Sequence, residues 1–193
     1  MTSCVEEVVQ SSIIELSLTA GLISPDFNYL YQGQNITYLC YSDEYYKPCV
    51  NQQPLLYKTF SNNLGKLVEL RAKDCYEDYK SDLISQGYDL SGDSEINVEM
   101  NPDGVVVSFA SVSIRSEDSS ERLPSLDFVV QSEIYNILMI VSSIVQFETN
   151  YGDSENLNFM QLYPGLSVVK HKRSDGTSIY VLESLNEPIK ISF

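Results

Sequence analysis

Four cysteines constrain the fold of this 193-residue chain more than any other feature of its sequence. They are Cys4, Cys40, Cys49 and Cys75, an even set that allows three patterns of pairing. Cys40 and Cys49 enclose the segment YSDEYYKP, whose proline and polar residues favour a chain reversal that brings the two Cβ atoms within reach. The sequence therefore predicts a Cys40–Cys49 disulfide, which leaves Cys4 to pair with Cys75.

The Cys4–Cys75 pair is expected to join two helices. Ser3-Cys-Val-Glu6 has the form of a capping box that begins a helix. Cys75 lies in a second helical pattern of about 30 residues, which starts after Pro54 and stops before Gly87. Two disulfides would place the protein in an oxidising compartment. The alternative is a cytosolic protein with four reduced thiols.

The rest of the hydrophobic pattern predicts an α+β fold in one domain spanning residues 1–193. After the N-terminal helix, residues 22–53 form an irregular region that the Cys40–Cys49 bond holds, and the long second helix follows. Period-two alternation then predicts a three-stranded antiparallel meander, with Asn101-Pro-Asp-Gly104 as its first turn. Further elements are an apolar helix that packs on this sheet, a short helix and a small C-terminal β element; their ranges are 134–147, 153–162 and 166–193.

Charge and hydropathy exclude several classes of partner. The chain has 12 basic and 27 acidic residues, a net charge of −15, so duplex nucleic acid and anionic bilayers would be repelled. No apolar run reaches the length of a membrane-spanning helix. The N-terminus, MTSCVEEVVQ, lacks the basic and apolar regions of an export signal. An extracytoplasmic location therefore predicts that a signal or membrane anchor has been removed, and that this anchor is the only link to the membrane.

A tyrosine-rich segment, residues 29–46, is the predicted binding surface. Tyrosine offers a large, rigid contact area with a hydrogen-bonding tip, as binding surfaces require. The expected partner is a protein or glycan at the cell surface, or another copy of the chain. Asn35-Ile-Thr37 in the same segment is an N-glycosylation sequon at Asn35. The tyrosines are Tyr29, Tyr31, Tyr38, Tyr41, Tyr45 and Tyr46.

The sequence contains no established catalytic motif such as GxSxG, HExxH, a phosphate-binding glycine loop or a dinucleotide-binding fingerprint. The single histidine, His171, lies between two lysines and apart from every cysteine, so neither a catalytic base nor a zinc site is expected there. We predict no catalytic residue, no cofactor and no metal site.

Acidic clusters are the remaining candidates for chemistry. Paired carboxylates act in glycosidases, and two carboxylates on one helix face can hold a divalent ion weakly. A third cluster has the spaced oxygens that calcium favours but lacks the full twelve-residue loop. A solvated acidic surface explains all three equally well. The clusters are Asp43 with Glu44, Asp74 with Glu77 and Asp78, and Asp89 with Asp93 and Glu95.

Three segments, YSDEYYKPCVNQQPLLYKTF, INVEMNPDGVVVSF and RSDGTSIYVL, resemble sequences of uncharacterised archaeal membrane proteins. Proteins of this family have one N-terminal transmembrane helix followed by an extracytoplasmic domain, and the resemblance covers most of the chain. It implies that Cys4, Cys40, Cys49 and Cys75 are disulfide partners, and it implies no catalytic residue.

These features favour a non-enzymatic cell-surface module, tethered to the membrane from its N-terminus, that binds a partner or has a structural role. Two alternatives remain. The first is an extracytoplasmic hydrolase with paired carboxylates, which requires a deep cleft containing an acid of raised pKa. The second is a pilin-like filament subunit whose N-terminal segment has been removed.

Overall fold

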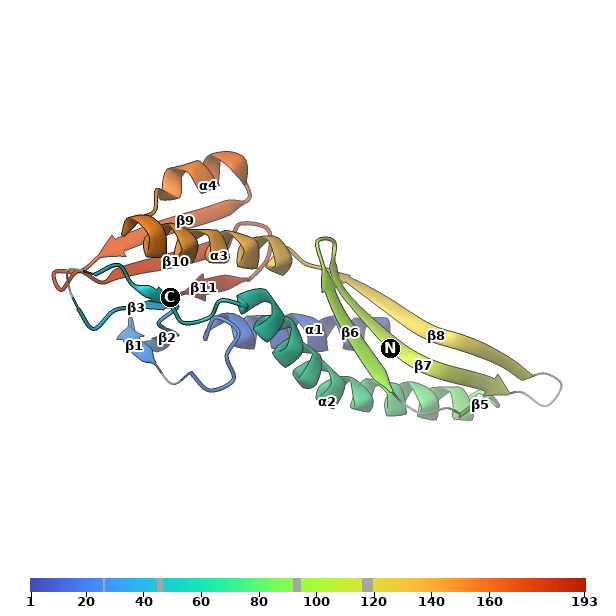
Figure 1. The fold of residues 1–193 in the computed structure, drawn as a ribbon. Helices are drawn as coiled ribbons and strands as arrows, with labels where there is room; N and C mark the ends of the chain where they lie inside the picture. Colours follow the sequence, from blue (N-terminus) through green and yellow to red (C-terminus); the bar gives the residue numbers. More distant parts are fainter. Residues whose placement is uncertain (26, 45–46, 92–94, 116–119) are drawn as a thin grey trace. The chain divides into compact units, whose positions relative to one another are not determined.

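The computed structural model describes residues 1–25, 27–44, 47–91, 95–115 and 120–193. These residues form helices and small antiparallel sheets, which confirms the α+β class (Figure 1). The chain divides into two compact units. Unit 1 contains Met1–Ser12 and Leu64–Ser132, and unit 2 contains Ile13–Asn63 and Glu133–Phe193.

The helices are α1 (Thr2–Ser17), α2 (Leu56–Ser85), α3 (Ile134–Tyr151) and α4 (Asn156–Leu162). The strands are β1 (Asn28–Tyr31), β2 (Gln34–Thr37), β3 (Cys40–Tyr41), β4 (Val50–Asn51), β5 (Asp89–Ser91), β6 (Ile96–Asn101), β7 (Gly104–Arg115), β8 (Ser120–Gln131), β9 (Leu166–Lys172), β10 (Ser178–Ser184) and β11 (Lys190–Ser192). The long second helix therefore has the predicted length of 30 residues. No helix in the described ranges is long and apolar enough to cross a membrane.

Unit 1 contains the predicted meander, β6–β7–β8, with β5 paired to the far end of β7. The Asn101 side chain accepts hydrogen bonds from the backbone N–H groups of Asp103 and Gly104, and so closes the first turn. Gly104 has a φ of 144°, and a Cβ there would lie 2.2 Å from the carbonyl oxygen of Val130. Only glycine fits this position, because any side chain would collide with the backbone of β8.

The helical part of unit 1 is joined by the Cys4–Cys75 disulfide, whose Cα atoms are 5.9 Å apart. Apolar residues at three- and four-residue spacing, such as Val5 on α1 and Val68 on α2, are completely buried. Tyr76 on α2 stacks on Phe109 of β7 with a distance of 5.5 Å between ring centroids. The disulfide and this aromatic contact therefore connect both helices and the meander into one core.

Unit 2 is built around the C-terminal sheet, in which β10 lies between β9 and β11. Side chains alternate across a strand, so successive residues of β10 face opposite sides of the sheet. On one side, Ile179 and Val181 form a buried cluster with Ile36 of β2, against which Tyr29 and Tyr31 pack. On the other side, Tyr180 bonds to Glu148 of α3. The β1–β2 hairpin and α3 thus cover the two faces of this sheet.

The apolar helix α3 differs from our prediction in its packing partner. We expected the meander to cover it, but α3 belongs to unit 2 and pairs with the C-terminal sheet (Figure 1). Its apolar positions are buried as expected, including Ile134, Leu138 and Ile144. A hydrophobic helix face specifies burial but does not specify which of two sheets provides it.

Residues 22–53 contain more regular structure than a loop. Two short antiparallel pairs occur there, β1 with β2 and β3 with β4. In the second pair, Cys40 lies opposite Asn51 and Tyr41 lies opposite Val50. The chain between β3 and β4 is closed by the Cys40–Cys49 disulfide, with 5.3 Å between the Cα atoms.

Candidate functional site

A pocket of about 530 Å³ lies in unit 2 and is the candidate functional site. Four regions form its wall: the β1–β2 hairpin with β3, the disulfide loop, the C-terminal end of α3, and the turn between β9 and β10. Volumes of this size are typical of small-molecule sites. The solvent-exposed residues of the lining are Tyr41, Lys47, Pro48, Asn150, Tyr151, Gly152, Lys172, Asp175 and Gly176.

Aromatic side chains form a continuous cluster at this pocket. Tyr29 meets Tyr38 edge to face at 6.0 Å between ring centroids, and Tyr38 meets Tyr41 in the same way at 5.7 Å. Tyr41 also stacks on Phe27 at 5.7 Å and is 40% exposed. The structure therefore brings three of the predicted binding tyrosines to one site.

The other predicted tyrosines do not join this cluster. Tyr31 meets the ring of His171 with 5.9 Å between ring centroids and lines a second concavity with Leu30 and Arg173, which shares Tyr29 and Lys172 with the first. Tyr45 and Tyr46 lie outside the described residues. The tyrosine-rich segment is therefore divided between two places.

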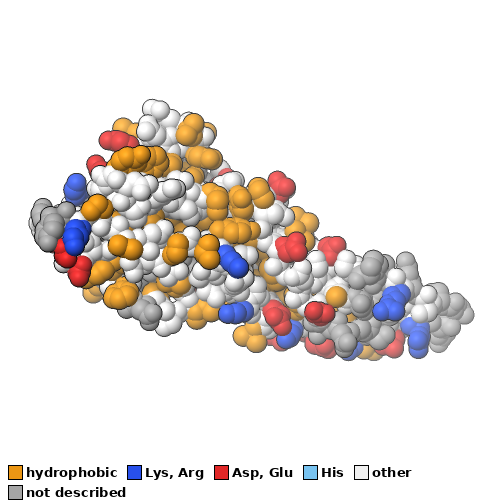
Figure 2. Space-filling view, viewed as in Figure 1, with side chains coloured by type: hydrophobic (Ala, Val, Ile, Leu, Met, Phe, Trp, Pro, Cys, Tyr) orange, Lys and Arg blue, Asp and Glu red, His pale blue; other side chains and the backbone are white. Residues whose placement is uncertain are grey.

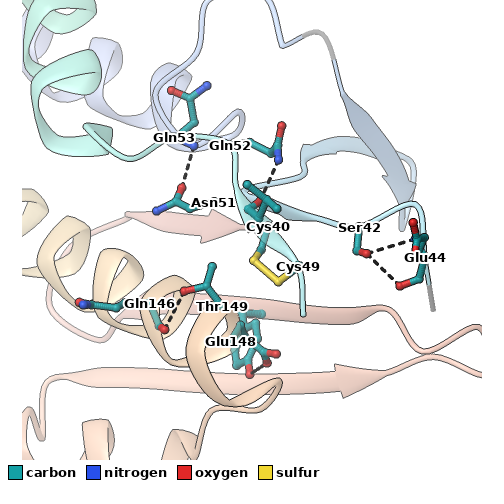
Figure 3. Close-up of a disulfide and its surroundings, with 12 residues drawn as sticks. Cys40, Ser42, Glu44, Cys49, Asn51, Gln52, Gln53, Gln146, Glu148 and Thr149 are labelled. Atoms are coloured by element: carbon teal, nitrogen blue, oxygen red, sulfur yellow. Dashed lines mark hydrogen bonds between the residues drawn. A yellow bond between two sulfur atoms is a disulfide. The ribbon is translucent and has the colours of Figure 1, made fainter. Parts of the chain in front are cut away.

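The Cys40–Cys49 disulfide is part of the pocket wall. Figure 3 shows it facing the last turns of α3, and both cysteines and Glu148 line the pocket. Beyond it, the Ser42 hydroxyl donates to the Glu44 carbonyl and accepts from the Glu44 N–H, which fixes the start of the loop. Both predicted disulfides are present, and they are consistent with an oxidising compartment.

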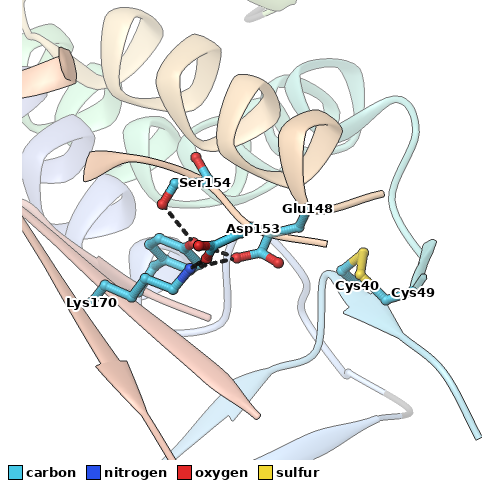
Figure 4. A network of polar contacts seen from close by, with 7 residues as sticks. Cys40, Cys49, Glu148, Asp153, Ser154 and Lys170 are labelled. Atoms are coloured by element: carbon cyan, nitrogen blue, oxygen red, sulfur yellow. Dashed lines mark hydrogen bonds and ion pairs between the residues drawn. A yellow bond between two sulfur atoms is a disulfide. The ribbon is translucent and has the colours of Figure 1, made fainter. Parts of the chain in front are cut away.

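A polar network anchors the sheet side of the pocket (Figure 4). The Lys170 ammonium donates to Glu148 at 2.9 Å and also bonds to Asp153. It lies 4.9 Å from the ring centroid of Tyr180, whose hydroxyl donates to Glu148 and, at 3.4 Å, to the carbonyl oxygen of Ser154. The Lys170 and Glu148 side chains are only 14% and 12% exposed, so this pair lies largely out of water.

The network shifts the proton affinities of its members. Burial alone would lower the pKa of Lys170, but hydrogen bonds to Asp153, Tyr180 and Glu148 outweigh it and raise the pKa well above its usual range. Burial and the bond to Glu148 raise the pKa of Tyr180 strongly. The hydrogen bond from Lys170 lowers the pKa of Asp153. Lys170 therefore stays charged and Tyr180 stays neutral at physiological pH.

Two pocket residues at the β9–β10 turn are linked to the tyrosine cluster. Burial raises the pKa of Tyr38, whose side chain is hydrogen-bonded to Thr177. Asp175 accepts from the Thr177 N–H at 2.9 Å, and hydrogen bonds from the backbone and side chain of Thr177 lower the pKa of Asp175. The turn is thereby held against the aromatic side of the pocket.

The glycosylation candidate Asn35 is exposed on β2. The threonine of its sequon is not: Thr37 is 2% exposed, and its hydroxyl donates to the Thr19 carbonyl at 2.9 Å. Asn35 is therefore accessible in the folded protein, whereas Thr37 is buried in the interior of unit 2.

Most described residues of the acidic clusters are exposed at the surface. Asp74, Glu77 and Asp78 are exposed along α2, and Asp89 and Glu95 are exposed in unit 1, while Asp93 lies outside the described residues. Asp43 is exposed, and Glu44 forms an ion pair with Lys47 at 2.9 Å. On the face shown in Figure 2, acidic side chains are scattered among basic and uncharged ones. Within the described residues, no three side chains that ligate metals come together.

Sequence reasoning missed half of the pocket wall. Glu148, Asn150 and Tyr151 lie at the end of an apolar helix that was expected to have only a packing role. Asp175 lies in the C-terminal β element, for which no binding role was predicted. A signal was the change from apolar to polar residues at Glu148, Thr149 and Asn150, the end of α3.

Comparison with known proteins adds no identification. The chain matches no protein-family model, no curated protein and no solved structure. The resemblance to archaeal membrane-anchored proteins therefore stays a prediction.

Proposed function

We propose that this chain is the extracytoplasmic part of a membrane-tethered, non-enzymatic binding protein, and that the tyrosine-lined pocket of unit 2 is its binding site. The observation that carries the proposal is the concave aromatic cluster of Tyr29, Tyr38 and Tyr41, part of whose surface stays exposed within a pocket of about 530 Å³. Pockets that combine aromatic walls with a few polar groups are the usual form of ligand sites.

The two disulfides support the proposed location. Each links residues that the fold already holds close together, and one of them forms part of the pocket wall. Such bonds persist in oxidising compartments and are reduced in the cytosol. Intact-mass measurement before and after reduction tests this part, because four free thiols in protein from an oxidising host would contradict an extracytoplasmic location.

The hydrolase alternative needs a carboxyl group whose pKa is raised so that it can donate a proton. Of the three carboxylates in the described lining, Glu148 accepts hydrogen bonds from Lys170 and Tyr180, Glu44 pairs with Lys47, and Asp175 has a lowered pKa. Each of them is therefore engaged by a donor of the protein itself. This arrangement favours binding over catalysis.

Nuclear magnetic resonance of tyrosine-labelled protein tests the binding site directly. The protein is titrated with a panel of neutral, acidic and basic oligosaccharides and of short aromatic peptides. We expect at least one class to cause saturable shifts at Tyr29, Tyr38 and Tyr41, with Tyr163, an exposed tyrosine outside the pocket, unchanged. A panel that shifts none of the three pocket tyrosines would refute the proposal, and cleavage of a bound probe would favour the hydrolase.

A further inference from the structure

We infer that the pocket of unit 2 takes an uncharged saccharide. This inference rests on the proposed function and names the class of ligand. It depends on three properties of the described lining: a small net charge, an accessible surface of mixed polarity, and exposed tyrosine.

The pocket carries little net charge, although the whole chain carries −15. Among the described residues of the lining, three carboxylates face two lysines, a net charge of −1, and Lys170, which lies outside the lining, is shared between Glu148 and Asp153. Lys47 lies 2.9 Å from Glu44, and Lys170 lies 2.9 Å from Glu148. An anion or a cation would have to compete with these internal partners, whereas a neutral ligand leaves them in place. The carboxylates of the lining are Glu44, Glu148 and Asp175, and its lysines are Lys47 and Lys172.

The accessible surface of the pocket combines polar and apolar atoms in similar amounts. Ile36, Leu39, Val145 and Ile179 line the pocket, yet each is no more than 3% exposed. The exposed residues of the lining include tyrosines and Pro48 together with side chains that carry amide and charged groups, such as Asn150 at the end of α3. A wholly apolar ligand would leave these groups without hydrogen-bond partners, at a cost to affinity. A ligand rich in hydroxyl groups satisfies them.

Tyrosine supplies the remaining element of recognition. One face of a sugar ring presents C–H groups, which pack on an aromatic ring, while the hydroxyl groups at its edge need polar partners. Tyr41 is 40% exposed and Tyr151 is 75% exposed, and both line the pocket. Together with the polar groups of the wall, these rings match both surfaces of a saccharide.

Tyrosine fluorescence provides the assay, because the chain contains no tryptophan to mask it. The probes are neutral tetrasaccharides of glucose and of N-acetylglucosamine, a tetragalacturonate as the acidic match, a tetraglucosamine as the basic match, and an aromatic tetrapeptide. We expect a neutral probe to bind with an affinity that changes little between 0.05 and 0.5 M salt, because no net charge is neutralised (about threefold or less).

Two variants localise the interaction. Tyr41→Ala removes an exposed ring and should weaken binding about tenfold. Tyr163→Ala is the matched control, since Tyr163 is 45% exposed in the same unit but does not line the pocket, and its affinity should be unchanged. Circular dichroism of both variants verifies that they fold.

The outcomes separate this inference from the proposed function. Preferential binding of tetragalacturonate, tetraglucosamine or the peptide, lost in Tyr41→Ala, would overturn the neutral saccharide and leave the pocket as the binding site. Binding of a neutral probe that Tyr41→Ala does not weaken would overturn the inference, because the saccharide would then lie elsewhere. Failure of every probe to bind would refute both.

Discussion

Removal of Lys170 should destabilise unit 2 more than removal of its partner Glu148. In Lys170→Met the Glu148 carboxylate, 12% exposed, loses its ion pair and keeps the hydrogen bond from the Tyr180 hydroxyl, so most of a buried charge is left unpaired. Loss of one partner of a buried pair typically costs about 3 kcal/mol. In Glu148→Gln the ammonium of Lys170 keeps Asp153 and the ring of Tyr180, so we expect a cost of about 1 kcal/mol.

Urea denaturation followed by the backbone amide signals of β9 and β10 measures both effects in unit 2 alone. With a slope of about 2 kcal/mol/M, a loss of 3 kcal/mol lowers the midpoint by about 1.5 M. The double variant Lys170→Met/Glu148→Gln should lose less stability than the two single variants added together, because neither substitution then leaves an unpaired charge on the other residue.

A surface pair provides the matched control. Lys190 and Glu183 lie 2.7 Å apart in the same sheet, and both side chains are 45% exposed. Lys190→Met should cost less than about 1 kcal/mol, as for other exposed ion pairs. Equal losses for Lys170→Met and Lys190→Met, or a larger loss for Glu148→Gln than for Lys170→Met, would refute this account of the buried network.

Two further predictions concern pH and the disulfides. The pKa values of Lys170 and Tyr180 are raised in the folded state, so their contribution to stability is complete at neutral pH. It falls as pH rises above about 10, where these groups lose protons in the unfolded chain. Urea midpoints should therefore decline from pH 8 to 11, less steeply in Tyr180→Phe, and a flat wild-type profile would contradict the raised pKa values. Replacing the Cys4–Cys75 bond by two alanines should cost about 4.4 kcal/mol, against about 2.7 kcal/mol for the Cys40–Cys49 bond, since the longer loop regains more chain entropy. Calorimetry of both variants tests this order, and equal losses would contradict it.

Local signals in the sequence were sufficient for most elements of the fold. The apolar spacing along α2 predicted a helix of the observed length, and Asn101-Pro-Asp-Gly104 marked the turn between β6 and β7 because its side-chain and glycine geometry suit a tight reversal. The two cysteine pairs also followed from local geometry and from the parity of the set. For the helix, the turn and the Cys40–Cys49 bond, the determining interactions lie within a few residues or within one periodic segment, whereas the Cys4–Cys75 pair, 71 residues apart, followed by elimination.

The pocket could not be predicted in the same way. Tyr38, Glu148 and Asp175 come from three segments separated by many residues, and their proximity depends on how α3 and the β1–β2 hairpin cover opposite faces of one sheet. The sequence assigned α3 to the meander, so the polar end of that helix had no predicted neighbour. Tyr31 shows the same limit, since it belongs to the tyrosine-rich segment but lies away from the cluster.

The division of the chain between the two units has a consequence for the order of synthesis. Each unit is assembled from two separate stretches of the chain. Unit 1 is incomplete until Leu64–Ser132 has been synthesised, and unit 2 is incomplete until Glu133–Phe193 has been synthesised. Cys4 emerges 71 residues before its partner Cys75, and Cys40 and Cys49 emerge in between. The first thiols that emerge after Cys4 are therefore not its native partner. If oxidation accompanies synthesis, the native pairing requires that Cys40 and Cys49 join each other before Cys4 reacts, or that thiol–disulfide exchange corrects a wrong bond.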